Sequence, residues 1–362
     1  MRAAHILPLA AVAVAVAVAG CGSSSGTTAV ATAPRADGRP QTGTLRIFSY
    51  DDTIAPEMLA RFKRANPGLD VKTATFESNQ EAAAKLAGGF EADVVEVCLD
   101  EMQPLVRRNL LRPLDTAGIS AWDDIVPSLR EAPGVVQDGR AFVAPLSAGS
   151  AGLVYNSDDL PAGIDSYADL FDPALKGRVA LDSGDTLAAL AVAALAQGYE
   201  NPMALSDEEV ARVGEQLADQ RGQFRAFPTS DADLVNLMKT GEVVAMNAGR
   251  GSAQEMLDEG IPVRWVAPRE GVISWVCGFA ITSKAKNIPA AYALIEDYLS
   301  PQTQAVSAAQ GFVITNGKAL PKVAASDRET ADPRSLEHAI AETEPENVAA
   351  YERAFQRIQA GG

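Results

Sequence analysis

The chain has 362 residues, 47% of them hydrophobic, and its 31 Lys and Arg against 47 Asp and Glu give a formal net charge of −16. This acidic excess argues against a nucleic-acid partner, because little remains to neutralise phosphates. The sequence has two His, His5 and His338, and shows neither a phosphate-binding loop nor a metal-spaced cluster. We therefore expect a protein that is not an enzyme and holds no cofactor or metal.

Residues 1–20 predict an export signal. Arg2 precedes an apolar run from Ile6 to Ala19, which suits a signal peptide better than a membrane span of roughly 20 apolar residues. The run ends in Val18-Ala19-Gly20-Cys21, which resembles the lipobox of bacterial lipoproteins, where the Cys is acylated. We expect Cys21 to anchor an extracytoplasmic protein to the cell membrane; the alternative is an ordinary secretory signal with an incidental Cys.

Residues 21–43 predict a flexible tether. The segment is rich in Gly, Ser, Thr, Ala and Pro and has almost no large apolar side chain, so it has nothing with which to build a core. A tether of this length reaches on the order of 25 Å from the bilayer surface.

From about Thr44 onward, short apolar strands alternate with helices. A stretch of this length is too long for one compact core and suits two lobes, and the alternation predicts a parallel α/β sheet. Expected strands cover 45–50, 71–76, 93–97, 178–181, 242–246, 261–266 and 278–281. Expected helices cover 58–65, 78–87, 186–197, 252–259 and 289–299, the second with Ser78 and Glu81 as a capping box.

Several segments follow one another in a familiar order. They include Phe48-Ser49-Tyr50 near the start, Lys176-Gly177, Ala267-Pro268-Arg269-Glu270-Gly271 followed by Trp275, and Gly311-Phe312. With them the chain, from about Leu45 to its C-terminus, resembles the bacterial spermidine/putrescine-binding proteins of ABC importers, within the wider family of extracellular solute-binding proteins.

The resemblance implies a two-lobed α/β fold of the type II periplasmic-binding-protein class, with the ligand in the cleft between the lobes. Lobe 1 is expected to comprise residues 44–145 and 278–318, and lobe 2 residues 146–277 and 319–362, which include C-terminal helices. The chain would leave lobe 1 near Pro145 and return near Gly278. It would be a monomer that delivers a small molecule to the permease subunits of an ABC importer.

The resemblance also implies ligand positions. A polyamine site needs aromatic faces for ammonium groups and carboxylates to pair them. The family's contacts fall on or beside Tyr50, Asp52, Cys98, Asp100, Asp182, Asp185, Met246, Asn247, Trp275, Cys277 and Phe312. We expect Trp275 to be the strongest single contact. Structural alternatives remain open: packing for Tyr50 and Trp275, and a helix N-cap for Asp100.

Some departures weaken the polyamine interpretation. Cys277 stands where the family carries an Asp that grips an amine, and Leu187 lies where a second acid is expected. Arg250, at the start of a helix beside the expected cleft, suits a carboxylate or phosphate; the alternative is an exposed Arg. We expect a polyamine or related small amine as ligand, with a zwitterionic or anionic solute, such as an amino-acid-like or phosphonate compound, as the alternative.

The resemblance places the strands that carry Cys98 and Cys277 side by side in lobe 1. In an oxidising compartment these residues are expected to form a disulfide. Two separate buried thiols are the alternative, while two Cys without nearby His do not make a convincing metal site.

Overall fold

The computed structural model describes residues 30, 39–76, 79–132, 134–183 and 186–360. The expected signal, Cys21, most of the tether, Ser78 and Asp185 lie outside these residues. In the described part, twelve strands form one mixed sheet, in which eight follow the order β2-β1-β3-β12-β7-β10-β8-β9.

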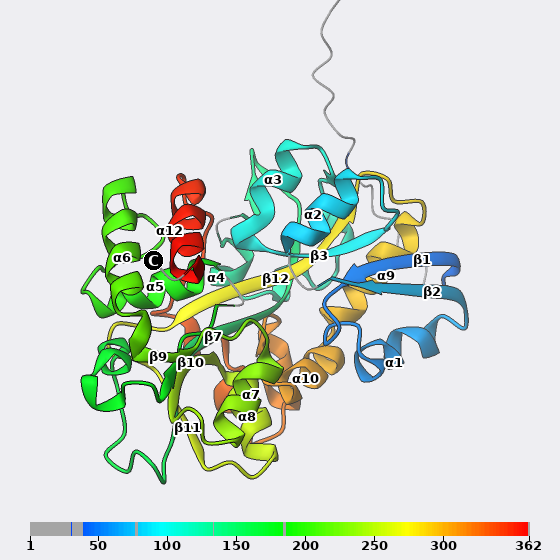
Figure 1. Ribbon diagram of the computed structural model, residues 1–362. Coiled ribbons are helices and arrows are strands. Elements are labelled where there is room, and N and C mark those ends of the chain that lie inside the picture. The colour runs from blue at the N-terminus through cyan, green and yellow to red at the C-terminus, as the bar shows by residue number, and fades with distance from the viewer. Residues whose placement is uncertain (1–29, 31–38, 77–78, 133, 184–185, 361–362) are drawn as a thin grey trace, which may run out of the picture.

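The strands on this path run through both halves of the molecule (Figure 1). They are β1 (Thr42–Ser49), β2 (Gly68–Thr75), β3 (Val94–Cys98), β7 (Ala144–Asn156), β8 (Val179–Ala180), β9 (Phe224–Ala226), β10 (Ala245–Gly249) and β12 (Ile273–Thr282). Shorter strands join them at the sides: β4 (Leu111–Arg112), β11 (Val263–Val266), β13 (Val313–Ile314) and β14 (Ile340–Ala341). A separate hairpin pairs β5 (Val136–Gln137) with β6 (Arg140–Ala141).

The helices cover both faces of the sheet. They are α1 (Pro56–Ala65), α2 (Asn79–Ala87), α3 (Met102–Arg107), α4 (Pro127–Arg130), α5 (Thr186–Ala196), α6 (Asp207–Asp219), α7 (Asp231–Lys239), α8 (Arg250–Asp258), α9 (Ile288–Tyr298), α10 (Pro301–Ala309), α11 (Arg328–Ala331) and α12 (Val348–Ala360). In the described residues, no helix is both long enough and apolar enough to cross a membrane.

Each lobe has an apolar core on both faces of its part of the sheet. In lobe 1, α1 and α9 pack on one face and α2 and α3 on the other. In lobe 2, α5, α6 and α12 cover one face and α7 and α8 the other. Figure 1 shows β12 running between the two groups of helices. The mixed α/β architecture agrees with the expected type II fold.

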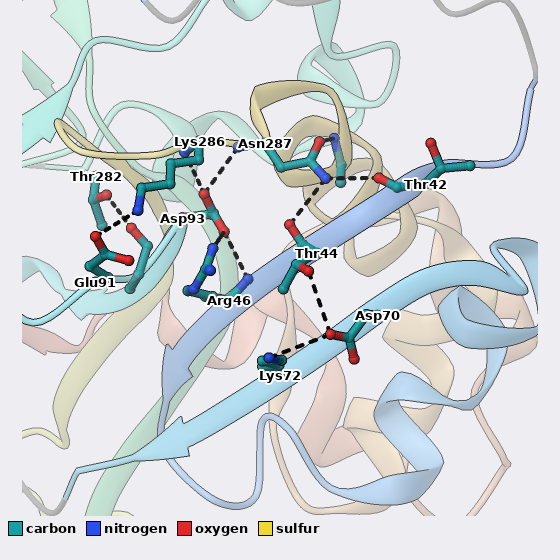
Figure 2. Close-up of polar contacts among 12 residues, drawn as sticks. Thr42, Thr44, Arg46, Asp70, Lys72, Glu91, Asp93, Thr282, Lys286 and Asn287 are labelled. Atoms are coloured by element: carbon teal, nitrogen blue, oxygen red, sulfur yellow. Dashed lines mark hydrogen bonds and ion pairs between the residues drawn. The ribbon is translucent and has the colours of Figure 1, made fainter.

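A buried acid fastens the edge of lobe 1 (Figure 2). Asp93, 1% exposed, accepts hydrogen bonds from the backbone N–H groups of Arg46, Lys286 and Asn287 at 2.8, 2.5 and 3.0 Å. Three donors satisfy a carboxylate that burial would otherwise penalise. The contacts tie β1 to the start of α9, which fixes the strand whose far end carries part of the cleft.

The lobes are joined by two crossing strands. β7 and β12 pair in antiparallel fashion, and their register shifts between Cys277 and Gly278, where Gly278 lies opposite Pro145. A Cβ at Gly278 would overlap the carbonyl oxygen of Ala144, so only Gly permits this close approach. Pro145 and Gly278, at which we expected the chain to change lobes, are therefore partners in the ladder.

Sequence patterning missed most of β7 because its Ala, Gly and Ser residues show no strand alternation.

Two expectations on element limits need correction. The strand expected at 242–246 begins only at Ala245 and runs to Gly249, because residues 241–244 complete the turn after α7, with Gly241 at φ 71°. The C-terminal part does not join lobe 2 at residue 319. Ala319, Val323 and Ala331 first pack against the α10 side of the molecule, and the chain reaches the core of lobe 2 later, with Ile340 of β14 and with α12.

Candidate ligand cleft

A cleft of about 640 Å³ opens between the lobes. Asp51 and Asp52 follow β1, Asp182 follows β8, and Gly249 ends β10. These are the carboxyl ends of parallel strands, where open α/β sheets bind their ligands. The volume lies within the range of small-molecule sites. The site therefore belongs to both lobes, so a bound ligand would hold them together.

Carboxylates dominate the walls. Arg250 is the one cation among the described lining residues. The acids that line the cleft are Asp51, Asp52, Asp182, Asp231, Glu255, Asp258 and Glu342. Opposing charges attract more strongly where protein displaces water, so the cleft favours a cationic ligand.

Asp52 and Asp231 line the cleft from opposite lobes. Burial raises the pKa of Asp52, a backbone hydrogen bond from Thr53 opposes this, and the nearby charges of Asp51 and Asp231 raise it further. Asp231 is the first residue of α7 and accepts a 2.6 Å hydrogen bond from Ser252 Oγ. Mutual repulsion at this point would be relieved by a positive charge between the two lobes.

Aromatic rings form another wall. Trp275 on β12 and Phe312 after α10 meet edge to face, with ring centroids 5.7 Å apart and planes at 78°. A Cβ at Gly149 would overlap the indole ring of Trp275, so Gly149 leaves the space in which that ring lies. An indole ring in a cleft lined by carboxylates suits an alkylammonium group, because the face of the ring can contact both the positive charge and the methylene groups.

The side chain of Asn247 supports Asp182 from behind. Asn247 is 1% exposed, and its Oδ1 accepts a 2.8 Å hydrogen bond from the backbone N–H of Asp182. Asn247 Nδ2 is buried without a hydrogen-bond partner. Its role in the site is to position Asp182, since its own amide does not line the cleft.

Other expected contacts lie away from the cavity. Met246 is wrong as a ligand contact: its side chain is 0% exposed and packs in the core beneath α7 and α8, because alternate residues of β10 face opposite sides of the sheet. Tyr50 is half-buried, with its ring 4.5 Å from that of Phe76. Asp100 is 6% exposed and lies within a 3-10 turn rather than at its N-cap. Neither Tyr50 nor Asp100 lines the cleft.

Cys98 and Cys277 are joined by a disulfide. They are directly opposed residues of β3 and β12, and Cys277 is 5% exposed. The link fastens the crossing strand to lobe 1 at the point where its register shifts. Neither residue lines the cleft, although Cys277 lies two residues from Trp275 on β12.

Residues 57–334 match the family described as bacterial extracellular solute-binding proteins. The chain belongs to this family. The resemblance on which we based the expected fold is thus confirmed at the level of a solute-binding protein.

Curated relatives cover most of the chain. It is 26% identical over 310 residues to the spermidine/putrescine-binding periplasmic protein 1 of Haemophilus influenzae, covering 83% of this chain and 82% of the relative. It is 27% identical over 327 residues to the putrescine/agmatine-binding protein of Pseudomonas aeruginosa, covering 84% and 86%.

Solved structures share the fold. The substrate-binding protein of a spermidine/putrescine ABC transporter from Streptococcus pneumoniae superposes with a TM-score of 0.74 at 22% identity, over 88% of this chain and 99% of that one. A binding protein of Agrobacterium tumefaciens, solved with agropinic acid, gives a TM-score of 0.64 at 19% identity, over 88% and 97%. This confirms the two-lobed fold.

In this solute-binding protein, Arg250 is not simply exposed. Its guanidinium carbon lies 3.8 Å from the ring centroid of Trp265, and one terminal nitrogen donates a 3.4 Å hydrogen bond to Thr330 Oγ1. Burial lowers its pKa and Glu329 opposes this. Because α8 belongs to lobe 2 while α11 packs beside α10, Arg250 links lobe 2 to the segment after α10 at the wall of the cleft.

Sequence reasoning missed several acids of the site. Asp231 follows the N-cap Ser230. The sequence shows the capping residue, but it does not show that Asp231 lines the cleft. Glu342 reaches the cavity because β14 pairs with the start of β12, a long-range contact with no local signal.

Proposed function

We propose that this chain is the extracytoplasmic binding component of an ABC importer, with a small organic polycation of the putrescine or spermidine type as ligand. The observation that carries the proposal is the cleft itself, where carboxylates from both lobes line the same cavity as an aromatic pair and outnumber Arg250, the one cation among its described lining residues. The names of its curated relatives support the same ligand class.

The cleft suits such a ligand in detail. Asp52 of lobe 1 and Asp231 of lobe 2 supply charges that a protonated amine would neutralise together, which favours the closed arrangement over the open one. Trp275 and Phe312 supply apolar faces for the methylenes between two amines. Where the family carries an Asp, this chain has Cys277. Acids at other positions of the same cleft supply negative charge in place of that Asp.

Calorimetric titration and thermal unfolding of residues 21–362, carrying Cys21→Ser to prevent acylation, test the ligand. At 100 times its Kd, a ligand stabilises the protein by about 2.7 kcal/mol, which raises Tm by about 2–4 °C. We expect this shift with putrescine, spermidine or agmatine. If none of these amines shifts Tm at millimolar concentration, the proposed ligand class is wrong.

A second candidate is a zwitterionic or anionic solute. Arg250 lines the cleft and its Nε is buried without a hydrogen-bond partner, which suits a carboxylate. Structural neighbours solved with agropinic acid and glucopine show that the same fold accommodates such compounds. A thermal shift with an amino-acid-like or opine compound, and none with polyamines, would favour this candidate.

We propose in addition that Cys21 is acylated and anchors a monomeric protein beside its permease. The lipobox-like sequence before Cys21 and the tether-like composition after it support this. Cys21→Ser is expected to move the protein from the membrane fraction to the soluble fraction. Uptake of labelled putrescine by cells that lack the chain would test the link to an importer.

A further inference from the structure

A carboxyl group lies buried beneath the turn that carries Asp52. Glu96 is the central residue of β3, between Val95 and Val97, and is 2% exposed. It does not line the cleft. In the described part of the chain, no ion pair joins Glu96 to a cation. A charged residue in the middle of a buried strand is costly unless its polar atoms are satisfied, so its partners explain why it is there.

In the part of the chain that the structure describes, three groups donate hydrogen bonds to Glu96, and all three belong to the Ser49–Thr53 turn. Ser49 Oγ donates to Glu96 Oε2 at 2.6 Å, and the backbone N–H of Tyr50 donates to the same oxygen at 3.3 Å. Thr53 Oγ1 donates to Oε1 at 3.1 Å. The two carboxyl oxygens of Glu96 therefore accept hydrogen bonds from both ends of this turn. The middle of the turn carries Asp51 and Asp52, which line the cleft.

Among the described residues, the charge that acts on Glu96 is that of an acid, Asp52. Burial raises the pKa of Glu96 to about 7, the nearby charge of Asp52 adds to this, and the hydrogen bonds from the turn oppose it. From α9, Tyr298 faces the same region: burial raises its pKa well above the ordinary value, Glu96 adds to this, and its hydroxyl donates to the carbonyl of Thr53 at 2.7 Å. From β12, Phe279 lies opposite Glu96 and brings no charge.

We propose that Glu96 is a positioning residue of the ligand site: its protonated form loses the proton to solvent when a cation arrives at Asp52, and the resulting carboxylate holds the Ser49–Thr53 turn. The inference rests on the proposed function and specifies how cation binding is coupled to pH. The proton leaves the Glu96 carboxyl group, and the positive charge of the ligand takes its place in the acidic cluster.

The hydrogen-bond chemistry supports this coupling. The backbone N–H of Tyr50 is only a donor, and the carboxylate accepts from it and from both hydroxyls at once. A protonated Glu96 carries an O–H that is a donor, and the hydroxyls of Ser49 and Thr53, which donate to it in the ionised state, are bonded partners that can accept it. The accepting hydroxyl must then turn its hydrogen elsewhere, so the protonated state holds the turn by a weaker set of bonds.

Affinity for a cation is therefore expected to rise with pH. If the ligand favours the ionised form of Glu96, binding releases up to one proton, and Kd falls by up to tenfold per pH unit where release is complete. The window lies below and around the pKa of about 7. Above it Glu96 is already ionised, so the dependence levels off.

Calorimetric titration of residues 21–362 with Cys21→Ser tests the coupling, with spermidine as probe from pH 5.5 to 8.0. Two buffers of different ionisation enthalpy at each pH give the number of protons released. The wild-type sequence is expected to bind more tightly as pH rises, with proton release. Glu96→Gln should flatten the pH profile and reduce the release. Glu91→Gln, which changes an exposed Glu just before the same strand, should behave as wild type. An unchanged profile in Glu96→Gln would overturn the inference.

A measurement without ligand separates this inference from the proposed function. The backbone amide resonance of Tyr50, followed by NMR in the unliganded protein, is expected to titrate with a midpoint near 7. Glu96→Gln should abolish this titration. Ser49→Ala removes the 2.6 Å hydrogen bond to Glu96 and should raise the midpoint of the Tyr50 titration. This variant replaces Glu96→Gln as the test if Glu96→Gln does not fold.

The two failures are distinguishable. If spermidine does not bind at any pH while Tyr50 still titrates through Glu96, the ligand class is wrong and the positioning role of Glu96 stands. If spermidine binds but Tyr50 does not titrate between pH 5.5 and 8.0, the inference is wrong and the proposed function stands.

Discussion

Trp275 on the crossing strand β12 meets Phe312 of the loop after α10, edge to face, with ring centroids 5.7 Å apart. Both rings line the cleft, and Phe312 is carried by the chain segment that follows α10 in lobe 1. The pair therefore joins the crossing strand to the segment after α10 at the wall of the cleft.

Removing the indole ring is expected to weaken polyamine binding. Trp275→Ala deletes a cation–π and methylene contact worth about 1–2 kcal/mol when shielded from water, so Kd for putrescine should rise about 5- to 30-fold by calorimetry. Gly149→Ala is a useful companion, because its new Cβ displaces Trp275 without changing the chemistry of that ring. Trp122→Phe, outside the cleft, is the control. Unaltered affinity in Trp275→Ala would exclude this ring as a ligand contact.

Asp231 is expected to contribute to cation binding from lobe 2. Asp231→Asn removes one of the two acids that face each other across the cleft, and we expect putrescine affinity to fall by about 1–3 kcal/mol, or roughly 5- to 150-fold. The same change should lower the pKa of Asp52, because Asp231 helps to raise it. Glu215→Gln, which removes an exposed charge on α6, controls for net charge. Tighter binding in Asp231→Asn would argue for an anionic ligand.

The disulfide should be detectable in solution. Denatured, unreduced residues 21–362 with Cys21→Ser are expected to show no free thiol, since Cys98 and Cys277 are bonded. The bond spans 179 residues of sequence, and its removal by Cys98→Ala together with Cys277→Ala should lower the free energy of unfolding by about 2–4 kcal/mol. Two titratable thiols per chain would instead mean separate buried Cys residues.

The stability of the unliganded protein should fall as pH rises toward neutrality. The pKa of Glu96 is raised from 4.5 to about 7 in the folded protein, so the folded state binds more protons than the unfolded state between these values. This contribution is complete below pH 4.5 and is lost as pH rises through 7, on the order of 2–3 kcal/mol. Urea unfolding of wild type and Glu96→Gln at pH 5 and pH 8 measures it. An equal change with pH in both proteins would assign the effect to other groups.

Arg250 separates the two ligand candidates. Its guanidinium stacks on Trp265 and reaches Thr330, so Arg250→Gln should loosen the contact between α8 and α11. Because the change removes the single cation among the described lining residues, putrescine affinity is expected to stay equal or to increase. Loss of binding of an amino-acid-like compound in this variant, measured by thermal shift, would show that Arg250 holds an anion.

Much of the architecture follows from local sequence signals. Short apolar strands alternating with helices predicted the α/β class, and ordered motifs from Phe48 to Phe312 indicated the solute-binding family, which the match over residues 57–334 shows. The positions at Asp52, Asp182, Trp275 and Phe312 were predicted from those motifs and line the cleft. Motifs at the ends of strands can predict site residues because the carboxyl ends of parallel strands meet at one edge of the sheet.

The tertiary structure decided which side chains reach that edge. Met246 looked suitable in sequence, yet strand pairing turns it into the core and leaves its neighbour Asn247 to hold Asp182. Asp231 and Glu342 enter the cleft from a helix start and from the C-terminal strand β14, and Glu96 lies hidden below the turn that it holds. Sequence by itself determined many of the elements and the family, because those depend on local patterns, but not the crossing strand β7, whose Ala, Gly and Ser residues show no alternation. Register and long-range pairing determined the site, because a shift of one residue along a strand exchanges its buried and exposed faces.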